Sequence, residues 1–231
     1  NPFILTDLDD NFLKIGYSYA TAFIAPTLYQ SYGSLPYVLP NFDLKPETNA
    51  SHELDFSFGK KDRTFVVNAS VFSRKEKDVF VYNWDNRKFL NVESNKVKGV
   101  ELGVQYHFNE KVNVGGNFSF AEKDNPATRL RSPKQRANAF LEILPIKNNR
   151  INISYQYTSK RNDAYYDSSS FSTKNVELEA FHLFNLNINQ KITKSLDTYL
   201  NVGNVLNTSY TDVIGYTTKP RNITLGVEYK F

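Results

Sequence analysis

The side chains with the most versatile chemistry in this sequence are three histidines, and their positions argue against catalysis. His107 lies beside a predicted short turn, whereas His52 lies near the opposite end of its strand, roughly a membrane's thickness away by strand geometry. His182 alternates in register with Ala180 and Phe184 on an apolar face. Because the three imidazoles cannot meet, we expect no metal site built on them.

Acidic residues in the connecting segments are the second group that could do chemistry. They are Asp124, Asp163, Asp167 and Asp212. An acid–base enzyme would need histidine beside aspartate at one rim of the molecule, and these segments contain no histidine. We therefore predict no catalytic residue and no cofactor.

Aromatic residues in the same segments indicate binding instead. The chain contains 15 Tyr, 18 Phe and 1 Trp. Tyr and Trp offer large rigid surfaces with a polar group, which suits bulky and partly apolar ligands. The candidate contacts are Tyr29, Tyr32, Tyr37, Trp84, Tyr165, Tyr166, Tyr210 and Tyr216, with Phe171 beside them. The alternative for any one of them is an aromatic girdle at a membrane interface, or packing between loops.

The elements that must position these residues are strands. The last nine residues place Ile223, Leu225, Val227, Tyr229 and Phe231 on one face and Thr224, Gly226, Glu228 and Lys230 on the other. An apolar face opposite a polar face is typical of an outer-membrane β-barrel, with lipid outside and water inside. The same alternation predicts ten strands: Phe12–Ala22, Ser51–Gly59, Thr64–Tyr82, Phe89–Phe108, Lys111–Glu122, Gln135–Leu144, Arg150–Arg161, Asn175–Gln190, Ser195–Leu206 and Pro220–Phe231.

Short and long connections alternate along the chain. The short ones are Gly59–Arg63, Asn109–Lys111, Pro145–Asn149 and Gln190–Lys194, and they are rich in turn-forming residues. The long ones are Thr21–Ala50, Ser73–Lys88, Lys123–Lys134, Asn162–Lys174 and Asn207–Lys219. Short turns of outer-membrane barrels face the periplasm and long loops face outside, so Phe231 falls at the periplasmic end, where it would serve barrel assembly.

Composition agrees with a barrel. Mean hydropathy is −0.49, and no stretch approaches the roughly 20 apolar residues of a membrane helix, which leaves a closed barrel as the spanning structure. The net charge is +4, but basic and acidic residues are interspersed, which argues against nucleic acid as a partner. The chain starts at Asn1-Pro2 without a signal peptide and contains no Met, so we expect residue 1 to lie in the middle of a longer protein.

Three motifs go beyond periodicity. They are Ala-Phe-Ile-Ala-Pro-Thr-Leu-Tyr-Gln at 22–30, Asn-Phe-Asp-Leu-Lys-Pro-Glu at 41–47 followed by Ser-His-Glu-Leu at 51–54, and Asn-Lys-Val-Lys-Gly-Val-Glu-Leu at 95–102. In this order, with an aromatic carboxy terminus, the chain resembles the TonB-dependent outer-membrane receptors, most closely the cobalamin and siderophore branch. In physical terms, Pro26 and Pro46 remove backbone donors and shape the first long loop. Glu47 and Glu53 are expected to accept hydrogen bonds within this loop or at the barrel wall.

The resemblance implies a 22-stranded transmembrane antiparallel barrel in the outer membrane of a Gram-negative bacterium, of which residues 1–231 would form about the last ten strands. It implies uptake of a scarce nutrient, a corrinoid or ferric siderophore, with energy passed from the TonB complex through an amino-terminal plug. The plug and the earlier strands, absent from this chain, would be its partners, together with lipid. A surface lipoprotein is a further candidate partner. Haem receptors would carry a histidine between the two proline motifs, and none occurs between Pro26 and Asn41.

Strand register adds a set of inner-wall residues. Glu101, Gln105, Arg136, Glu142, Glu177 and Glu179 are predicted to point inward, where the plug would lie. Two other classes of protein stay open at this point: a barrel enzyme of about ten strands, and a soluble β-sandwich that binds carbohydrate.

Overall fold

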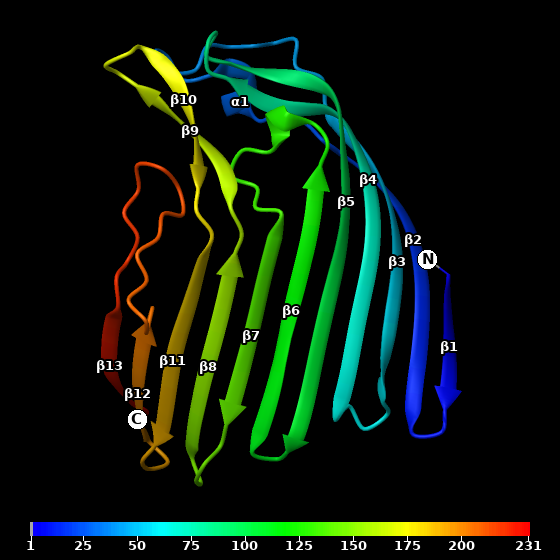
Figure 1. The fold of residues 1–231 in the computed structure, drawn as a ribbon, viewed down its shortest axis with the longest axis vertical. Helices are drawn as coiled ribbons and strands as arrows, with labels where there is room; N and C mark the ends of the chain where they lie inside the picture. Colours follow the sequence, from blue (N-terminus) through cyan, green and yellow to red (C-terminus); the bar gives the residue numbers. More distant parts are fainter. Residues whose placement is uncertain (1) are drawn as a thin grey trace.

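The computed structural model describes residues 2–231, except for the side chains of Glu93 and Ala127, and consists mainly of one curved antiparallel sheet (Figure 1). Its eleven strands are adjacent in chain order: β1 (Phe3–Leu8), β2 (Asn11–Ile24), β3 (Glu47–Lys60), β4 (Phe65–Asn83), β5 (Lys88–Asn109), β6 (Val112–Lys123), β7 (Gln135–Ile143), β8 (Asn149–Thr158), β11 (Phe181–Lys191), β12 (Leu196–Gly203) and β13 (Asn222–Tyr229). The strands β9 (Arg161–Asp167) and β10 (Ser172–Leu178) form a separate hairpin. Two short helices, α1 (Leu28–Tyr32) and η1 (Pro126–Thr128), lie in connections.

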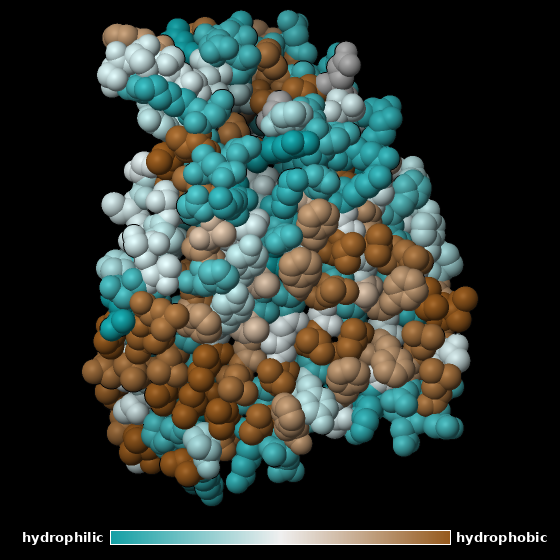
Figure 2. All heavy atoms as spheres, in the orientation of Figure 1, coloured by the Kyte–Doolittle hydropathy of each residue, from teal (hydrophilic) through white to brown (hydrophobic). Residues whose placement is uncertain are grey.

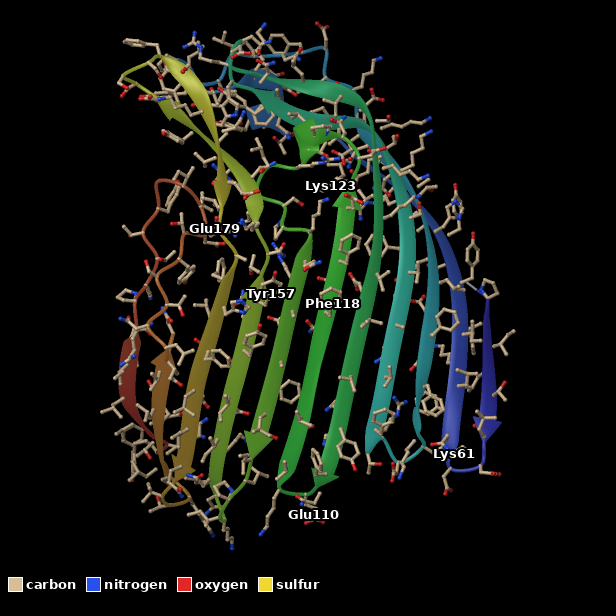
Figure 3. All side chains as sticks on the ribbon, viewed as in Figure 1. Lys61, Glu110, Phe118, Lys123, Tyr157 and Glu179 are labelled. Carbon is tan, nitrogen blue, oxygen red and sulfur yellow. The ribbon has the colours of Figure 1, made fainter. Side chains whose placement is uncertain are left out.

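The connections divide the sheet into two ends. Tight turns lie at the lower end in Figure 1, called the turn end here. The long connections, α1 and the β9–β10 hairpin lie at the upper end, called the loop end. In Figure 3, Lys61 and Glu110 mark the turn end, Lys123 and Glu179 lie toward the loop end, and Phe118 and Tyr157 lie midway. The predicted alternation of short and long connections is therefore confirmed except between β4 and β5, where only residues 84–87 separate the strands.

Cross-strand register gives the sheet two chemically different faces. Val71, Val100 and Phe120 lie opposite one another on β4, β5 and β6, and they define the apolar face. Ser70, Glu101, Ser119 and Arg136 form the adjacent row on β4 to β7, and they define the polar face. This is the period-two pattern expected of a barrel wall.

Large side chains on the apolar face are half-exposed along the strands. Leu102 is 45% exposed, Val104 48% and Leu225 77%. Apolar residues gather over the lower half of the face seen in Figure 2, and hydrophilic residues dominate the loop end. The buried apolar side chains among the described residues lie toward the loop end instead: Val38, Val97, Ala164, Leu178 and Phe181. The wall therefore presents its apolar surface outward.

A second stacked sheet would be needed for a β-sandwich, and the described chain contains none; the small β9–β10 hairpin continues beyond the loop end (Figure 1). Within residues 2–231 no helix is long and apolar enough to cross a membrane. The all-β prediction is confirmed, while the soluble sandwich is not supported.

The structure differs from several of the strand and loop predictions. An eleventh strand, β1, precedes the predicted ones, and β3 begins at Glu47, four residues before the predicted start. The predicted strand Asn175–Gln190 is split between β10 and β11, because Glu179 and Ala180 break the ladder and β10 pairs only with β9. The predicted loop Ser73–Lys88 is mostly paired strand, and only the residues from Trp84 to Arg87 form the turn.

Candidate functional site

The first proline motif forms the start of the loop-end structure. Thr27, which follows Pro26, is the N-cap of α1, and its hydroxyl accepts a hydrogen bond from the Gln30 N–H at 3.2 Å. The Gln30 side-chain oxygen accepts from the Thr27 N–H at 2.8 Å, which completes a capping box. The motif therefore sets the geometry of the loop, as its residues predict.

The rest of this loop is fastened to the extension of β4 and β5. Asn91 accepts a hydrogen bond from the Lys45 N–H at 2.8 Å and donates to the Lys45 carbonyl oxygen at 3.0 Å. The Arg87 guanidinium donates to the Pro36 carbonyl oxygen at 2.9 Å, and the Asn41 side chain donates to the Phe89 carbonyl oxygen at 2.8 Å. Side-chain bonds to backbone thus take the place of a strand ladder in ordering this segment.

This attachment assembles an aromatic cluster, defined as Tyr29, Tyr82, Trp84 and Phe89. The ring centroids are 5.9 Å apart for Tyr29 and Phe89, 5.3 Å for Tyr82 and Phe89, and 5.0 Å for Tyr82 and Trp84, all with edge-to-face geometry. The Tyr82 hydroxyl donates to the Tyr37 carbonyl oxygen at 3.1 Å. Two predicted contacts, Tyr29 and Trp84, are therefore brought together by Tyr82 and Phe89, which were predicted only as strand residues.

A hollow of about 390 Å³ lies beside this cluster. Its lining includes Tyr82, Trp84, Leu130 and Arg131, together with carboxylates of Glu76 and Asp163. Trp84 is 39% exposed and Tyr29 53% exposed, so aromatic surface is accessible from outside. The arrangement offers apolar rings and one guanidinium to a ligand.

Asp163 joins the segments around this hollow. Its side chain is buried and accepts hydrogen bonds from the Arg131 guanidinium at 2.7 Å and from the Ile214 N–H at 2.9 Å. Burial opposes ionisation of this carboxyl, but the Ile214, Arg131 and Ala164 hydrogen bonds outweigh it and hold the pKa of Asp163 below its ordinary value. Arg131 uses only its Nε in this bond, and half of its side chain is exposed.

The other predicted aromatic contacts form no single cluster with these. Tyr32 packs against Phe42 at 5.3 Å, and Tyr165 and Tyr166 lie on β9 with Phe171 at the hairpin turn. Tyr210 packs against Phe181 at 4.6 Å. Tyr210 and Tyr216 line a second hollow of about 680 Å³, which shares Arg131 with the first. Arg131 therefore lies between the two hollows.

The predicted inner-wall residues fall into two groups. Glu101, Gln105, Arg136 and Glu142 lie on the polar face by register. A hollow of about 900 Å³, lined by polar-face residues that include Glu53, Asp55 and Glu101, shows that this face is concave. Glu53 accepts a hydrogen bond from the Ser70 hydroxyl at 2.7 Å there, as predicted for the barrel wall.

Glu177 and Glu179 do not lie on this wall, and their predicted position is wrong. Glu177 is on β10 and Glu179 follows it, so neither belongs to the 11-stranded sheet. Both carboxylates pair with the Lys160 ammonium, each at 3.3 Å. Their register was inferred from one continuous strand, which the structure divides.

The histidines lie on separate strands. The Nδ1 atoms of His52 and His182 are each 2.8 Å from a tyrosine hydroxyl, of Tyr17 and Tyr155 respectively. His107 is beside the β5–β6 turn. Among the residues that the structure describes, no three His, Asp or Glu side chains gather as a metal site.

Comparisons with known proteins identify relatives of this chain. A family profile described as "TonB dependent receptor-like, beta-barrel" matches residues 4–205. The vitamin B12 transporter BtuB of Vibrio cholerae is 27% identical over 219 residues, which are 93% of this chain and 34% of the transporter. The chain thus spans about a third of the length of the curated relatives it matches.

Solved structures of low identity share the fold. FpvA of P. aeruginosa, solved with bound pyoverdine and iron, has a TM-score of 0.77 at 16% identity, covering 98% of this chain and 32% of the receptor. The copper transporter OprC has a TM-score of 0.75 at 18% identity, covering 99% of this chain and 39% of OprC.

These relatives are named as transporters and receptors, and none of those cited is named as an enzyme. Receptors with this barrel lie in the outer membrane of Gram-negative bacteria, and so does this chain, with its apolar face toward lipid. Because the family profile matches most of its length, the chain belongs to the TonB-dependent receptors and forms part of their transmembrane β-barrel.

Proposed function

We propose that this chain is the carboxy-terminal part of a receptor that captures a corrinoid or a ferric siderophore and imports it with TonB-coupled energy. The observation that carries the proposal is the aromatic cluster of Tyr29, Tyr82, Trp84 and Phe89 at the loop end of a receptor barrel, in which Tyr29 and Trp84 are exposed. A relative aligned with 93% of the chain is named as a vitamin B12 transporter, and a structural neighbour was solved with bound pyoverdine. Both of these ligands are bulky.

Two kinds of side chain at this site would contact the ligand, aromatic rings and the Arg131 guanidinium. Aromatic rings with two rotatable bonds contact a large ligand at small entropic cost. Arg131 holds its guanidinium against Asp163 through Nε and leaves its terminal nitrogens for an anionic group of the ligand. Transport itself needs no covalent chemistry from this chain.

The test uses the longer receptor that contains this chain, purified in detergent. Cyanocobalamin and a ferric hydroxamate siderophore are titrated separately by calorimetry against wild type, Trp84→Ala and Tyr106→Leu. Tyr106 lies on the apolar face at the turn end, so its variant is the control for loss of an aromatic side chain. We expect one of the two ligands to bind, and Trp84→Ala to weaken that binding at least tenfold while Tyr106→Leu stays within twofold of wild type. Equal effects of the two variants would contradict the proposal.

We further propose that Glu101, Gln105, Arg136 and Glu142 contact a plug domain supplied by the rest of the receptor, through which TonB would act. Glu101 and Arg136 form no ion pair within the described residues, although both are exposed on the concave polar face. Unpaired charges on an enclosed wall suit an inserted domain that presents a group of opposite sign to each of them. Glu177 and Glu179 are not included, and a surface lipoprotein at the loop end remains part of the proposal without a residue assigned to it.

The plug contact is tested by Arg136→Glu in the longer receptor. The expected result is a leakier barrel, measured as increased sensitivity of cells to a bulky antibiotic that the outer membrane normally excludes. Lys147→Glu, at an exposed turn-end position, makes the same charge change outside the wall and should leave sensitivity unchanged.

A further inference from the structure

Amide side chains form a row across the polar face, midway between the turn end and the loop end. Cross-strand register places five residues of β4 to β8 directly opposite one another: Asn68, Gly103, Asn117, Asn138 and Gln156. We call the four amides of this set the amide row. Each lies two positions along its strand from the polar row that contains Ser70 and Arg136, so all four face the inside of the barrel. Phe118 and Tyr157, the chain neighbours of Asn117 and Gln156, mark this height in Figure 3.

A hollow of about 440 Å³ lies along the amide row. The amides that line it are those of the row together with Gln105 and Asn185. None of the described residues that line this hollow is charged, whereas the neighbouring hollow of about 900 Å³ includes three carboxylates in its lining. An added Cβ at Gly103 would meet nothing within 4 Å, so the recess is open at this position. The wall therefore contains a recess that is polar and uncharged.

The chain itself uses little of the hydrogen-bonding capacity of the amide row. The Asn138 amide nitrogen donates to the Asn117 side-chain oxygen at 3.0 Å, and the Asn68 side-chain oxygen accepts from the Ser57 hydroxyl at 2.7 Å. Within the described part of the chain, the Gln156 side chain forms no hydrogen bond, although a primary amide can donate two and accept two. All four amides are exposed. Donors and acceptors are therefore free to pair with a bound molecule.

This recess adjoins the hollows of the loop end. Asn185 lines both the recess and the hollow of about 680 Å³ that Tyr210 and Tyr216 line. Arg131 lines that second hollow and also the one of about 390 Å³ beside the aromatic cluster. Shared lining residues thus connect the candidate site to the amide row in one series. A ligand that leaves the aromatic cluster toward the turn end would meet the amide row on its way.

We propose that the amide row is a second binding site for the imported ligand, and that it takes a ligand surface rich in uncharged carboxamide groups. Carboxamides donate and accept hydrogen bonds in the same way as Asn and Gln side chains, so they can pair with the row while they lose contact with water. A charged group in this recess would find no counter-ion in the described lining, which makes its desolvation costly. The corrinoid of the proposed function fits this requirement, because carboxamide side chains surround its ring. The inference rests on the proposed function, since the ligand reaches this wall only during import.

The test uses the longer receptor, both purified in detergent and expressed in cells, with radiolabelled cyanocobalamin as the probe. The row variant is Asn117→Leu/Asn138→Leu, which removes two amides. The control variant is Asn113→Leu/Asn152→Leu, because these amides lie on the same face of β6 and β8 but do not line the recess. Heat-modifiable migration on a gel confirms that each variant is folded.

We expect cyanocobalamin to bind both purified variants within about twofold of wild type, because the loop-end site is unchanged. The maximal rate of uptake by cells should fall about tenfold in the row variant with little change in the half-saturating concentration, since the lost contacts follow capture. The control variant should keep wild-type uptake. Unchanged uptake in the row variant, an equal fall in the control variant, or weakened capture by the purified row variant would each overturn the proposal.

A second measurement detects the contact directly and decides the matter if the row variant does not fold. Gln156→p-benzoylphenylalanine should cross-link the radiolabelled probe in energised cells, and the labelling should disappear when the proton gradient is collapsed. Asn152→p-benzoylphenylalanine, on the same face of the same strand, is the control and should be labelled far less. Equal labelling at the two positions would show that the ligand has no preferred site on this wall.

Binding by the wild type separates this inference from the proposed function. If the wild-type receptor binds the ferric hydroxamate siderophore but not cyanocobalamin, the carboxamide site is refuted and the proposed receptor function stands. If it binds neither ligand, both are refuted.

Discussion

At the scale of single residues, the close approach of an aromatic ring leaves no room for a side chain at Gly99. Phe72 lies opposite it on the polar face, and a Cβ at position 99 would lie 2.4 Å from Phe72 Cζ and 2.5 Å from the Phe120 carbonyl oxygen. A methyl group there must displace the ring or the neighbouring strand. We expect Gly99→Ala to destabilise the folded barrel by about 1–3 kcal/mol, a usual cost of overpacking.

Gly103 provides the matched control for this prediction. It lies on the same face of the same strand, four residues along, and an added Cβ would meet nothing within 4 Å. Guanidinium unfolding of the two variants in the longer receptor, followed by the loss of heat-modifiable migration, measures the difference. Equal stability of Gly99→Ala and Gly103→Ala would show that the ring can move without cost.

Asp163 makes the loop-end structure sensitive to acid. Because its folded pKa lies below the ordinary value of 3.8, ionised Asp163 stabilises the fold above that pH, and the contribution is lost as pH falls through the lower folded pKa. We expect amides near Ile214 to lose protection from hydrogen exchange below about pH 4, after correction for the intrinsic exchange rate. The Arg161 guanidinium still donates hydrogen bonds to the carbonyl oxygens of Thr211 and Asp212 at this pH. The loss of protection is therefore confined to the residues near Ile214.

Two variants decide whether Asp163 is responsible. Asp163→Asn should weaken protection near Ile214 already at neutral pH and remove its dependence on pH. Asp167 is the control, because hydrogen bonds from Lys174, Ser169 and Ser170 also lower its pKa, yet it lies at the hairpin turn away from Ile214. Asp167→Asn should therefore keep the wild-type pH profile there, and a profile changed equally by both variants would refute the assignment.

At the scale of elements, the first long loop is ordered by its attachment to β5. Asn91 bonds both backbone groups of Lys45 and the Asp78 carbonyl oxygen, so its loss leaves three backbone groups without a partner. We expect Asn91→Ala to weaken the local structure of residues 34–46 by about 1–3 kcal/mol. Hydrogen exchange of these amides should accelerate at least fivefold. Asn86→Ala is the control, since within the described part of the chain the Asn86 side chain bonds only the nearby Lys88 N–H. Unchanged exchange in Asn91→Ala would mean that the remaining contacts suffice.

Strand elements were predictable wherever one face meets lipid and the other meets water. β4, β5 and β13 show this alternation clearly, and the structure places them close to their predicted bounds. The β9–β10 hairpin was not predictable in this way, because Asp163 and Ala164 are buried in succession by neighbouring loops. β1 was missed because its six residues are all exposed and too few to show a period.

The candidate site was predictable only in part. Aromatic residues in loops identified Tyr29 and Trp84, but Tyr82 and Phe89, which join them, were excluded as strand residues. The contacts that bring the loop to β5 link residues 46 to 51 positions apart, and no local pattern encodes such pairs.

At the scale of the whole molecule, the sheet has two open edges. Within residues 2–231, β1 and β13 each pair with a single neighbouring strand, so the outer side of each leaves backbone groups unpaired in this sheet. In hydrocarbon each unsatisfied group costs several kcal/mol, which rules out a stable open wall facing lipid. The fold therefore requires further strands to close the cylinder between β13 and β1.

This requirement predicts how the 231-residue chain behaves when it is produced alone. We expect it to aggregate, or to associate through its edges, and to lack the heat-modifiable migration that a closed barrel shows, because edge pairing with other copies replaces the missing strands. The longer receptor should refold into detergent and show that migration. Adding the missing strands as a separate polypeptide should restore heat-modifiable migration to the 231-residue chain, because those strands supply backbone hydrogen-bond partners to both open edges. A monomeric, heat-modifiable form of the 231-residue chain alone would mean that β1 and β13 can close on each other, and the wide-barrel assignment would then fail.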